Sequence, residues 1–525
     1  MKKTFIIHPF LFAIFPILFL YSHNIGQLSM VSLSEILIPI VIILGFTAIA
    51  VLFFWLILKK DCKKAGIIVA IFLVLFFSYG RVYDPIKGLK IGNFIIGGHR
   101  YLLIVWLILF ILGTYFTIRT KKDLRNFSNI LNVVAVVLVL FSLVNIGIYK
   151  FKARDIQEYN STNLQEEEEA NISENQSELP DIYYIIFDGY AGANSLEEFY
   201  NYDNHEFIDY LTNKGFYVAS KSRCNYPWSY LTLASSLNME YINYLSEDAG
   251  LKSDDRTLPY QMITNSKVWK FLHSKGYQFV HFNCSGWGPT DRNINADISI
   301  QCNRLNEFNI LLIQTTMLKP FEKYIIVDSA RDKILDSFSN LARVHKIEGP
   351  KYIFAHIMSP HPPFFFGANG ELIPEAEYKL YTYWDQEKYL NQLIFVNSNI
   401  EIFIEEILSK SKVPPIIVLQ GDHGARSTLG DPHGDREDPA NIGWFDPTAE
   451  MLRESTFILN AYYLPQNGGD LLYDSITPVN TFRLIFNIYF DGDYELLEDK
   501  CYYSPYWQPY NFFDVTEIKN YNQQQ

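Results

Sequence analysis

Three side chains able to bind a metal ion stand just after apolar stretches of this sequence. Asp188 follows the run Ile182–Phe187, and the pair Asp422 and His423 follows the run Pro415–Leu419. Aspartate oxygens and a histidine imidazole can together bind one Zn²⁺ or Mn²⁺ ion. We therefore predict that Asp188, Asp422 and His423 are the protein ligands of a divalent metal ion.

The Asp-His pair lies between two glycines, Gly421 and Gly424, which let the backbone turn tightly. Taken alone, an Asp-His-Gly triplet is equally typical of an ordinary surface turn. The same chemistry at the ends of several predicted strands favours the metal site over the turn.

Strand and helix patterns alternate around these residues from position 181 onward. Helices are predicted at 207–214, 227–238, 267–275, 388–408 and 477–488, and strands at 182–187, 216–219, 278–282, 351–357, 415–419 and 455–459. This alternation is typical of an α/β fold with a mostly parallel central sheet flanked by helices. In such sheets ligands bind beyond the carboxyl ends of the strands, and Asp188, His361 and Asp422 all fall there.

The first 150 residues differ from the rest because they are mostly Ile, Leu, Val and Phe. Five apolar stretches predict an N-terminal bundle of five transmembrane helices, at 4–21, 36–58, 65–79, 101–118 and 130–149. Lysine and arginine clusters before the first stretch, at 59–64 and at 119–125 place the N-terminus in the cytoplasm and the C-terminal domain outside. A cleaved signal peptide is the alternative for the first stretch, but no small-residue cleavage site follows it.

The predicted domains are a transmembrane domain at 1–150, an acidic flexible linker at 151–179 and an extracytoplasmic catalytic domain at 180–525. Lys and Arg total 44 against 57 Asp and Glu, a net charge of −13, so nucleic acid is not an expected partner. Five cysteines are too few for a disulfide scaffold. Outside the cytoplasm, Cys284 and Cys302 could still form a single disulfide.

Four segments of the C-terminal part carry motifs: IIFDGY (185–190), SPHPPF (359–364), LQGDHG (419–424) and ESTFILNAYYLP (454–465). In this order they resemble the alkaline phosphatase superfamily, in its sulfatase-like branch. Lipoteichoic acid synthases and lipid A phosphoethanolamine transferases are similar in layout, with five transmembrane helices before an external catalytic domain. The resemblance implies that Asp188, Asp422 and His423 are metal ligands and that His361 contacts the phosphate of the substrate.

In those families a Thr, a Ser or a modified Cys at a helix N-terminus attacks the substrate, where the helix dipole favours the developing anion. The matching window here, CNYPWSYLTLASSLN, offers Cys224, Ser229 and Thr232. The sulfatase pattern Cys-x-Pro-x-Arg is not met, and alignment on Pro227 puts Asn225, an amide, at the nucleophile position. We predict Ser229 as the nucleophile and Asn225 as a substrate-binding residue. The alternatives are Thr232, Cys224 or no nucleophile.

Further residues give weaker signals. Arg426 could pair bidentately with a phosphate group or be an ordinary surface arginine. Asp431 and His433 could complete a second metal site or lie in a solvated loop. His356 is typical of a core histidine, and Trp287 could line a substrate cleft or pack in the core.

The sequence therefore predicts a membrane-anchored, metal-dependent phosphotransferase or phosphodiesterase that uses a hydroxyl nucleophile on lipid head groups or cell-surface glycans. The expected cofactor is one divalent ion, Mn, Zn, Mg or else Ca, and a second ion is left open. The alternatives are an ester hydrolase of the sulfatase or phosphatase type, and a degenerate sulfatase-like domain that only binds. The oligomeric state is left open.

Overall fold

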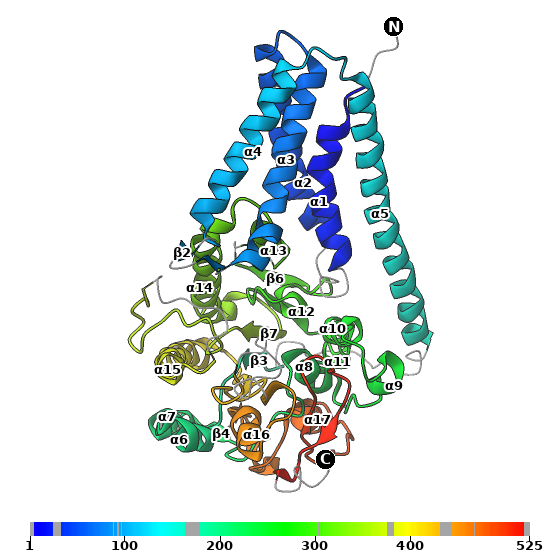
Figure 1. The fold of residues 1–525 in the computed structure, drawn as a ribbon. Helices are drawn as coiled ribbons and strands as arrows, with labels where there is room; N and C mark the ends of the chain where they lie inside the picture. The colour runs from blue at the N-terminus through cyan, green and yellow to red at the C-terminus, as the bar shows by residue number, and fades with distance from the viewer. Residues whose placement is uncertain are drawn as a thin grey trace. The chain divides into compact units, whose positions relative to one another are not determined.

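The computed structural model of this chain describes residues 5–24, 33–87, 89–91, 94–95, 97–162, 179–302, 305, 307–374, 383–430, 443–466 and 468–518. The chain divides into two compact units. The first consists of Met1–Glu168 with Leu305–Ile326, and the second of Glu169–Arg304 with Val327–Gln525. Figure 1 labels their helices and strands.

The first unit contains the apolar helices α1 (His8–His23), α2 (Leu33–Ile57), α3 (Cys62–Ile86), α4 (His99–Arg119) and α5 (Arg125–Thr162). Among the described residues, four helices, α2 to α5, are long and apolar enough to cross a membrane, and α1 is a shorter apolar helix. These are the five apolar helices that the sequence predicts. A two-stranded hairpin, β1 (Lys90–Ile91) and β2 (Phe94–Ile95), connects α3 to α4.

Two features of this unit differ from the sequence prediction. α5 continues to Thr162, so the first part of the segment predicted as a linker is helical. The rest of that segment, 163–178, lies outside the described residues. In addition, α13 (Glu307–Thr315) and the 3₁₀ turn Lys319–Phe321 come from the middle of the C-terminal sequence but belong to this unit, where α13 packs against α3.

The second unit is built on a seven-stranded sheet in the order β4-β9-β8-β3-β7-β5-β6. The strands are β3 (Ile182–Phe187), β4 (Tyr217–Val218), β5 (Gln278–Asn283), β6 (Ile298–Gln301), β7 (Lys351–Ile357), β8 (Ile416–Gly421) and β9 (Asn460–Tyr463). Five of them, from β8 to β6, run parallel, and β9 and β4 extend one edge in antiparallel pairings. The predicted α/β fold with a mostly parallel sheet is confirmed.

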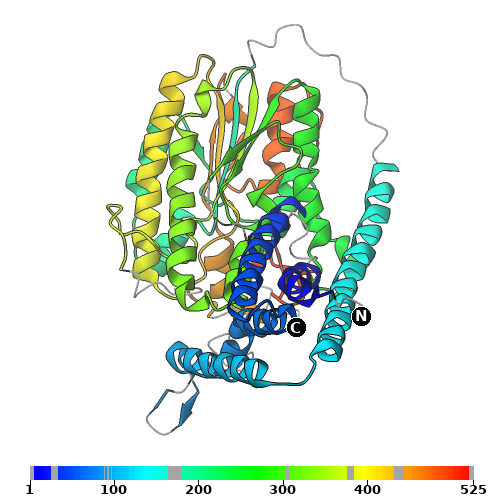
Figure 2. The same ribbon diagram turned by 90° about the horizontal axis from the view of Figure 1, so that it is seen from above.

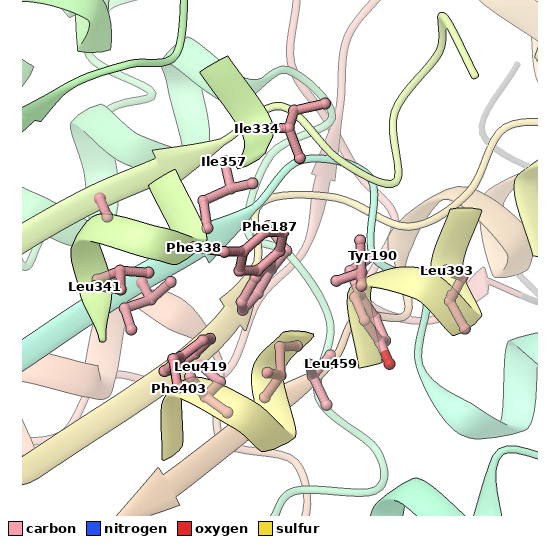
Figure 3. Close-up of a cluster of buried hydrophobic side chains, with 14 of the residues drawn as sticks. Phe187, Tyr190, Ile334, Phe338, Leu341, Ile357, Leu393, Phe403, Leu419 and Leu459 are labelled. Carbon is pink, nitrogen blue, oxygen red and sulfur yellow. The ribbon is translucent and has the colours of Figure 1, made fainter. Parts of the chain in front are cut away.

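Helices cover both faces of this sheet (Figure 2). One face carries α6 (Ala193–Tyr200), α7 (His205–Asn213), α14 (Glu322–Leu341) and α15 (Gln386–Lys410), and the other carries α8 (Ser229–Asn238), α10 (Thr257–Thr264), α11 (Lys267–Ser274) and α17 (Pro478–Tyr489). Successive side chains of a strand point to opposite faces. Phe187 of β3 therefore packs on Phe338 of α14, with ring centroids 6.4 Å apart (Figure 3). Tyr184 packs on Phe482 of α17 at 5.0 Å.

The shorter elements of this unit are α9 (Leu245–Ala249), α12 (Gly288–Asp291), α16 (Ala449–Thr456) and the pair β10 (Tyr502–Tyr503) and β11 (Phe513–Asp514). Two predicted boundaries shift. The strand predicted at 455–459 is wrong in position, because α16 runs to Thr456 and β9 begins only at Asn460. α8 begins at Ser229 with Trp228 as its N-cap, so Pro227 lies before the helix.

A disulfide bond joins Cys284 and Cys302, whose Cα atoms are 5.1 Å apart. The two cysteines directly follow the neighbouring parallel strands β5 and β6. Strand pairing therefore brings together two residues that are 18 positions apart in the sequence. The disulfide that the sequence allows between Cys284 and Cys302 is therefore formed.

We predict that the double substitution Cys284→Ala and Cys302→Ala destabilises the chain by about 3 kcal/mol, because it releases a loop whose closure restricts the unfolded state. The measurement is the apparent Tm of the purified full chain in detergent, followed by tryptophan fluorescence. The control is Cys62→Ser, which alters an exposed free cysteine. Equal Tm values for the double variant and the control would contradict the prediction.

Candidate active site

Strand register brings the three predicted metal ligands together. β3 pairs in parallel with β8, with Phe187 opposite Gly421, so the next residues, Asp188 and Asp422, leave the sheet side by side. The ligand atoms of Asp188, Asp422 and His423 all lie within 4.8 Å of one another, and the three residues are buried. His423 Nε2 is 3.2 Å from Asp188 Oδ1 and 3.7 Å from Asp422 Oδ2. Ligand atoms that bind one Zn²⁺ tetrahedrally at ~2.0 Å are about 3.3 Å apart, which is close to these separations.

The hydrogen bonds of this cluster leave one atom of each residue without a partner. Asp422 Oδ1 accepts hydrogen bonds from the backbone N–H groups of Gly189 and His423, at 3.0 and 2.9 Å. His423 Nδ1 donates to the carbonyl of Gly424 at 2.7 Å, so Nε2 is the ring nitrogen that remains for a ligand. Within the described part of the chain, Asp188 Oδ1, Asp422 Oδ2 and His423 Nε2 are buried without a hydrogen-bond partner. A cation can bind all three atoms, whereas a proton on Nε2 would leave a carboxylate oxygen unpaired, so these residues fit a divalent metal ion.

The surrounding imidazoles keep Asp188 ionised. Burial by itself opposes the charged form, but His361, His423 and His356 outweigh burial and hold the pKa of the carboxyl group well below its usual range. The side chain is therefore an anionic ligand at neutral pH.

His356 is the residue that the sequence interpretation undervalued. It lies in the core, as predicted, but in β7 opposite Ile186 of β3, and its Nε2 is 3.6 Å from Asp188 Oδ2. Its Nδ1 is 2.8 Å from Thr290 Oγ1, while Nε2 has no hydrogen-bond partner among the described residues. Burial lowers the pKa of the ring by more than the carboxylates of Asp188 and Asp422 raise it. Only the pairing of β7 with β3 reveals this neighbour, and no sequence motif encodes that pairing.

A small pocket beside His423 contains both His361 and Arg426, two of the predicted substrate-binding residues. The residues that line it are Gly189, His361, Pro362, Phe364, Tyr383, Tyr389, His423, Gly424, Ala425 and Arg426. The backbone N–H of His361 donates to Asp188 O at 3.0 Å. Its ring Nε2 is 3.1 Å from the Tyr383 hydroxyl, so a substrate oxygen that contacts this nitrogen must displace Tyr383.

Arg426 is buried, which excludes the alternative of an ordinary surface arginine. Its guanidinium group donates to the carbonyl of Pro227 and lies 5.0 and 5.4 Å from the ring centroids of Trp228 and Trp444. Stacking on aromatic rings and a fixed hydrogen bond orient the planar group before any ligand arrives. Because Pro227 and Trp228 directly precede α8, Arg426 also ties the Asp-His-Gly loop to the start of that helix.

The three nucleophile candidates have different surroundings. Ser229 is the first residue of α8 and is partly exposed; the first N–H groups of a helix have no intrahelical partner. Thr232 is buried, and its hydroxyl donates to the carbonyl of Tyr226 at 2.8 Å. Cys224 is fully buried, and burial raises the pKa of its thiol well above the usual value. Of the three candidates, Ser229 is therefore the one that is partly exposed.

Asn225 has a structural role in place of the predicted contact with substrate. Its amide nitrogen donates to the carbonyl of Lys500 at 2.9 Å, and its amide oxygen accepts from the backbone N–H of Val479 at 2.8 Å. The side chain is completely buried. It fastens the segment before α8 to the start of α17 and to the C-terminal segment.

Two weaker predictions gain no support as site residues. Asp431 and His433, considered for a second ion, lie outside the described residues. The Trp287 ring lies 5.5 Å from the His356 ring in an edge-on contact, and a contact of this kind suits packing as well as a substrate cleft.

Glu454 holds the loop that follows the Asp-His-Gly motif. Its carboxylate accepts hydrogen bonds from the backbone N–H and hydroxyl groups of both Ser427 and Thr428, and from the Tyr200 hydroxyl. Gly424 lies so close to α16, the helix that carries Glu454, that an added Cβ would be 2.3 Å from the carbonyl oxygen of Glu454. The completely buried carboxylate thus fixes the loop that carries Arg426.

Comparisons with known proteins were made for the whole chain. No protein-family model and no curated protein matches it. Among solved structures, it is similar to the C-terminal periplasmic domain of EcEptC from Escherichia coli, at 12% identity and a TM-score of 0.41, over 67% of this chain and 95% of that one. It is also similar to the integral membrane protein lipooligosaccharide phosphoethanolamine transferase A from Neisseria meningitidis, at 10% identity and a TM-score of 0.35, over 91% of this chain and 94% of that one.

The Campylobacter jejuni phosphoethanolamine transferase EptC gives a similar result for its C-terminal periplasmic domain, at 11% identity and a TM-score of 0.34, over 63% of this chain and 94% of that one. Sulfatases are among the other similar structures. These are the classes of protein that the sequence motifs resemble. At such identities and TM-scores they carry no conclusion about activity, and the proposals below rest on this chain's own residues.

We predict that Asp422→Asn abolishes stoichiometric binding of a divalent ion. The amide oxygen can still accept the hydrogen bonds from Gly189 and His423, whereas the charge that faces the ion site is lost. Elemental analysis of the purified full chain measures bound Zn and Mn, and the rise in Tm on adding each metal provides a second readout. Asp203→Asn, an exposed position, is the control. An unchanged metal content in Asp422→Asn would rule out the predicted ligand set.

We predict that Glu454→Ala lowers stability by about 2–3 kcal/mol, because partly buried donors on Ser427 and Thr428 lose their acceptor. The apparent Tm of the full chain is the measurement. Glu450→Ala, an exposed glutamate on the same helix, is the matched control. If both variants melt together, Glu454 does not hold the loop.

Proposed function

We propose that this chain is a membrane-anchored, metal-dependent phosphotransferase or phosphodiesterase. The single observation that supports this most is the convergence of three buried, unpartnered ligand atoms, from Asp188, Asp422 and His423, beside a pocket that contains an oriented arginine. An anionic ester at this point would find a dication on one side and a guanidinium group on the other. Phosphate esters are the common substrates that require such a pair of positive groups.

In this proposal Asp188, Asp422 and His423 hold one divalent ion, with His356 as a further neighbour of Asp188. When bound, the ion supplies Lewis-acid stabilisation of phosphoryl oxygens and activation of a hydroxyl group. Arg426 binds the non-bridging oxygens of the ester, and His361 contacts them after Tyr383 moves aside. Ser229 attacks phosphorus from the N-terminus of α8, where the helix dipole favours the developing alkoxide. The bond from phosphorus to the diacylglycerol oxygen breaks, and diacylglycerol leaves with the proton that the serine hydroxyl gives up. The acceptor hydroxyl or water then displaces the serine oxygen from phosphorus, which restores the Ser229 hydroxyl.

The proposed substrates follow from the anchoring. Helices α2 to α5 have the length and composition to cross a membrane, and the lysine and arginine clusters favour a catalytic unit outside the cytoplasm. A site tethered there has lipid head groups and surface glycans within reach, but no cytosolic nucleotide. We therefore assign a phospholipid as donor and a surface glycan, a lipid or water as acceptor.

We predict that the full chain in mixed micelles releases diacylglycerol from a fluorescent phosphatidylethanolamine or phosphatidylglycerol, and that chelation of divalent ions stops the release. Arg426→Lys is expected to lower kcat/KM by about 10²-fold, because lysine cannot provide the planar two-donor fork. Ser229→Ala is expected to lower it by about 10³-fold or more. The matched controls are Arg453→Lys and Ser398→Ala, which alter exposed side chains.

The same assay separates the alternatives. Metal-dependent cleavage of aryl sulfates without cleavage of phosphodiesters would replace the proposal by a sulfatase. Full activity of Ser229→Ala together with loss of activity in Asp422→Asn would replace the covalent step by direct attack of water. A chain that binds metal but cleaves none of these esters would favour a binding protein.

A further inference from the structure

Residues 305–326 lie within the C-terminal sequence, yet they pack in the unit of apolar helices. Phe308 of α13 is completely buried there, in a cluster with residues of α1 and α3 such as Leu73, and its ring lies 6.3 Å from the Tyr21 ring. The chain therefore leaves the sheet unit after the disulfide at Cys302 and enters the helical unit for some 20 residues.

The contact with α3 is close. An added Cβ at Gly80 would lie 1.9 Å from the carbonyl oxygen of Gln314 and 2.8 Å from Thr315 Cα. The backbone N–H of Met317 donates to the carbonyl of Phe76 at 2.9 Å. Only a residue without a side chain at position 80 permits this approach, so the end of α13 is seated directly on the backbone of α3 (Figure 1).

The turn that follows α13 is pinned at the same end of α3. Lys319 Nζ is 2.6 Å from Asp84 Oδ1 and 5.7 Å from the centroid of the Tyr83 ring. Tyr83 belongs to an aromatic cluster of α3 and α4 that includes Tyr79 and Trp106. Tyrosine and tryptophan gather at the level of the lipid head groups in membrane proteins.

The outward side of the turn is apolar. Leu318 is 42% exposed and Phe321 is 56% exposed. On the neighbouring α3, Val74 and Val82 are exposed as well. In a helix that crosses a bilayer, such exposed apolar residues face lipid. The turn therefore combines exposed apolar side chains with a lysine that pairs with Asp84 at the end of α3, which is the pattern of an interfacial membrane segment.

We propose that residues 316–324 insert into the interfacial layer of the lipid bilayer, on the side of the membrane where α3 ends and α4 begins. Lipid covers the exposed side chains of Leu318 and Phe321, at a depth between the head groups and the upper part of the acyl chains. The sheet unit thus has a second attachment to the membrane besides the connection that follows α5. This inference concerns membrane contact only, so it stands or falls independently of the proposed chemistry.

The test uses the full chain in nanodiscs of phosphatidylethanolamine and phosphatidylglycerol. In a Cys62→Ser background, Phe321→Cys carries an environment-sensitive fluorophore. Ile402→Cys, at a 62% exposed apolar position of α15 in the other unit, is the matched control, and Leu52→Cys on α2 is the lipid-facing reference. Quenching is measured with lipids that bear a nitroxide high on the acyl chain, and with aqueous iodide.

The expected result is a blue-shifted emission at position 321, with quenching by the nitroxide lipid several-fold stronger than at 402 and weak quenching by iodide. Iodide quenching at 321 equal to that at 402 would place the turn in water and overturn the proposal. Weak quenching by both agents would show that protein covers the turn, from the sheet unit or from a second copy, and would overturn it equally. A fluorophore at position 52 that is quenched by nitroxide confirms that the chain is inserted.

Discussion

Two buried carboxylates, Asp188 and Asp422, must lie within a few ångströms of each other because the strands that carry them are neighbours in register. Burial of one unpaired carboxylate costs several kcal/mol, and a second nearby adds repulsion. The protein pairs one oxygen of Asp422 with two backbone N–H groups and surrounds Asp188 with imidazoles. It leaves the remaining oxygens facing His423 Nε2 without a donor. This arrangement lies at the carboxyl ends of parallel strands, where α/β proteins bind ligands, and its uncompensated negative charge fits a bound cation.

Two helices near the site, α15 and α16, hold three loops against the cluster of Asp188, Asp422 and His423. Tyr389 of α15 donates to the carbonyl of Gly189 at 2.8 Å and accepts from the N–H of Ala191 at 3.1 Å. One turn later, Gln392 donates to the carbonyl of His361 at 3.1 Å. Glu454 of α16 accepts hydrogen bonds from the backbone N–H groups of Ser427 and Thr428, in the loop after His423. These supports bond to loop backbone from helices packed behind them, so the loops are oriented without placing additional charge in the pocket.

The sequence could predict this centre because its parts are local. A buried strand reads as a continuous apolar run, and a polar residue directly after it must emerge at the strand end, which is how Asp188, Asp422 and His423 were found. Glu454 could not be found in this way. It lies one residue before the strand predicted at 455–459, and the apolar run 457–459 hides the fact that α16 continues to Thr456. The carboxylate is buried through contacts with Ser427, Thr428 and Tyr200, and no local pattern connects these positions.

The role of glycine illustrates the same limit. Gly421 and Gly424 were expected to allow a tight turn, but neither has a positive φ. They are needed because other backbone lies against them. A Cβ added at Gly421 would lie 2.5 Å from the carbonyl oxygen of Tyr190, and a Cβ added at Gly424 would lie 2.3 Å from the carbonyl oxygen of Glu454. Similarly, residues 305–326 fall within the predicted catalytic domain at 180–525, although they belong to the unit of apolar helices. Periodicity indicates that a segment is buried, but it does not indicate against what.

The departure from the sulfatase pattern in the 224–232 segment has a structural explanation. The position that alignment assigns to the nucleophile holds Asn225, whose amide is fully used to fasten this segment to α17 and to the C-terminal segment. Cys224 and Thr232 are likewise committed to the interior. The proposed attack therefore uses the hydroxyl of Ser229, at the first turn of α8, where Arg426 already contacts the preceding carbonyl of Pro227. Because the segment is bound on both sides, Cys224 and Thr232 stay in the interior, and Ser229 is the candidate that is left partly exposed.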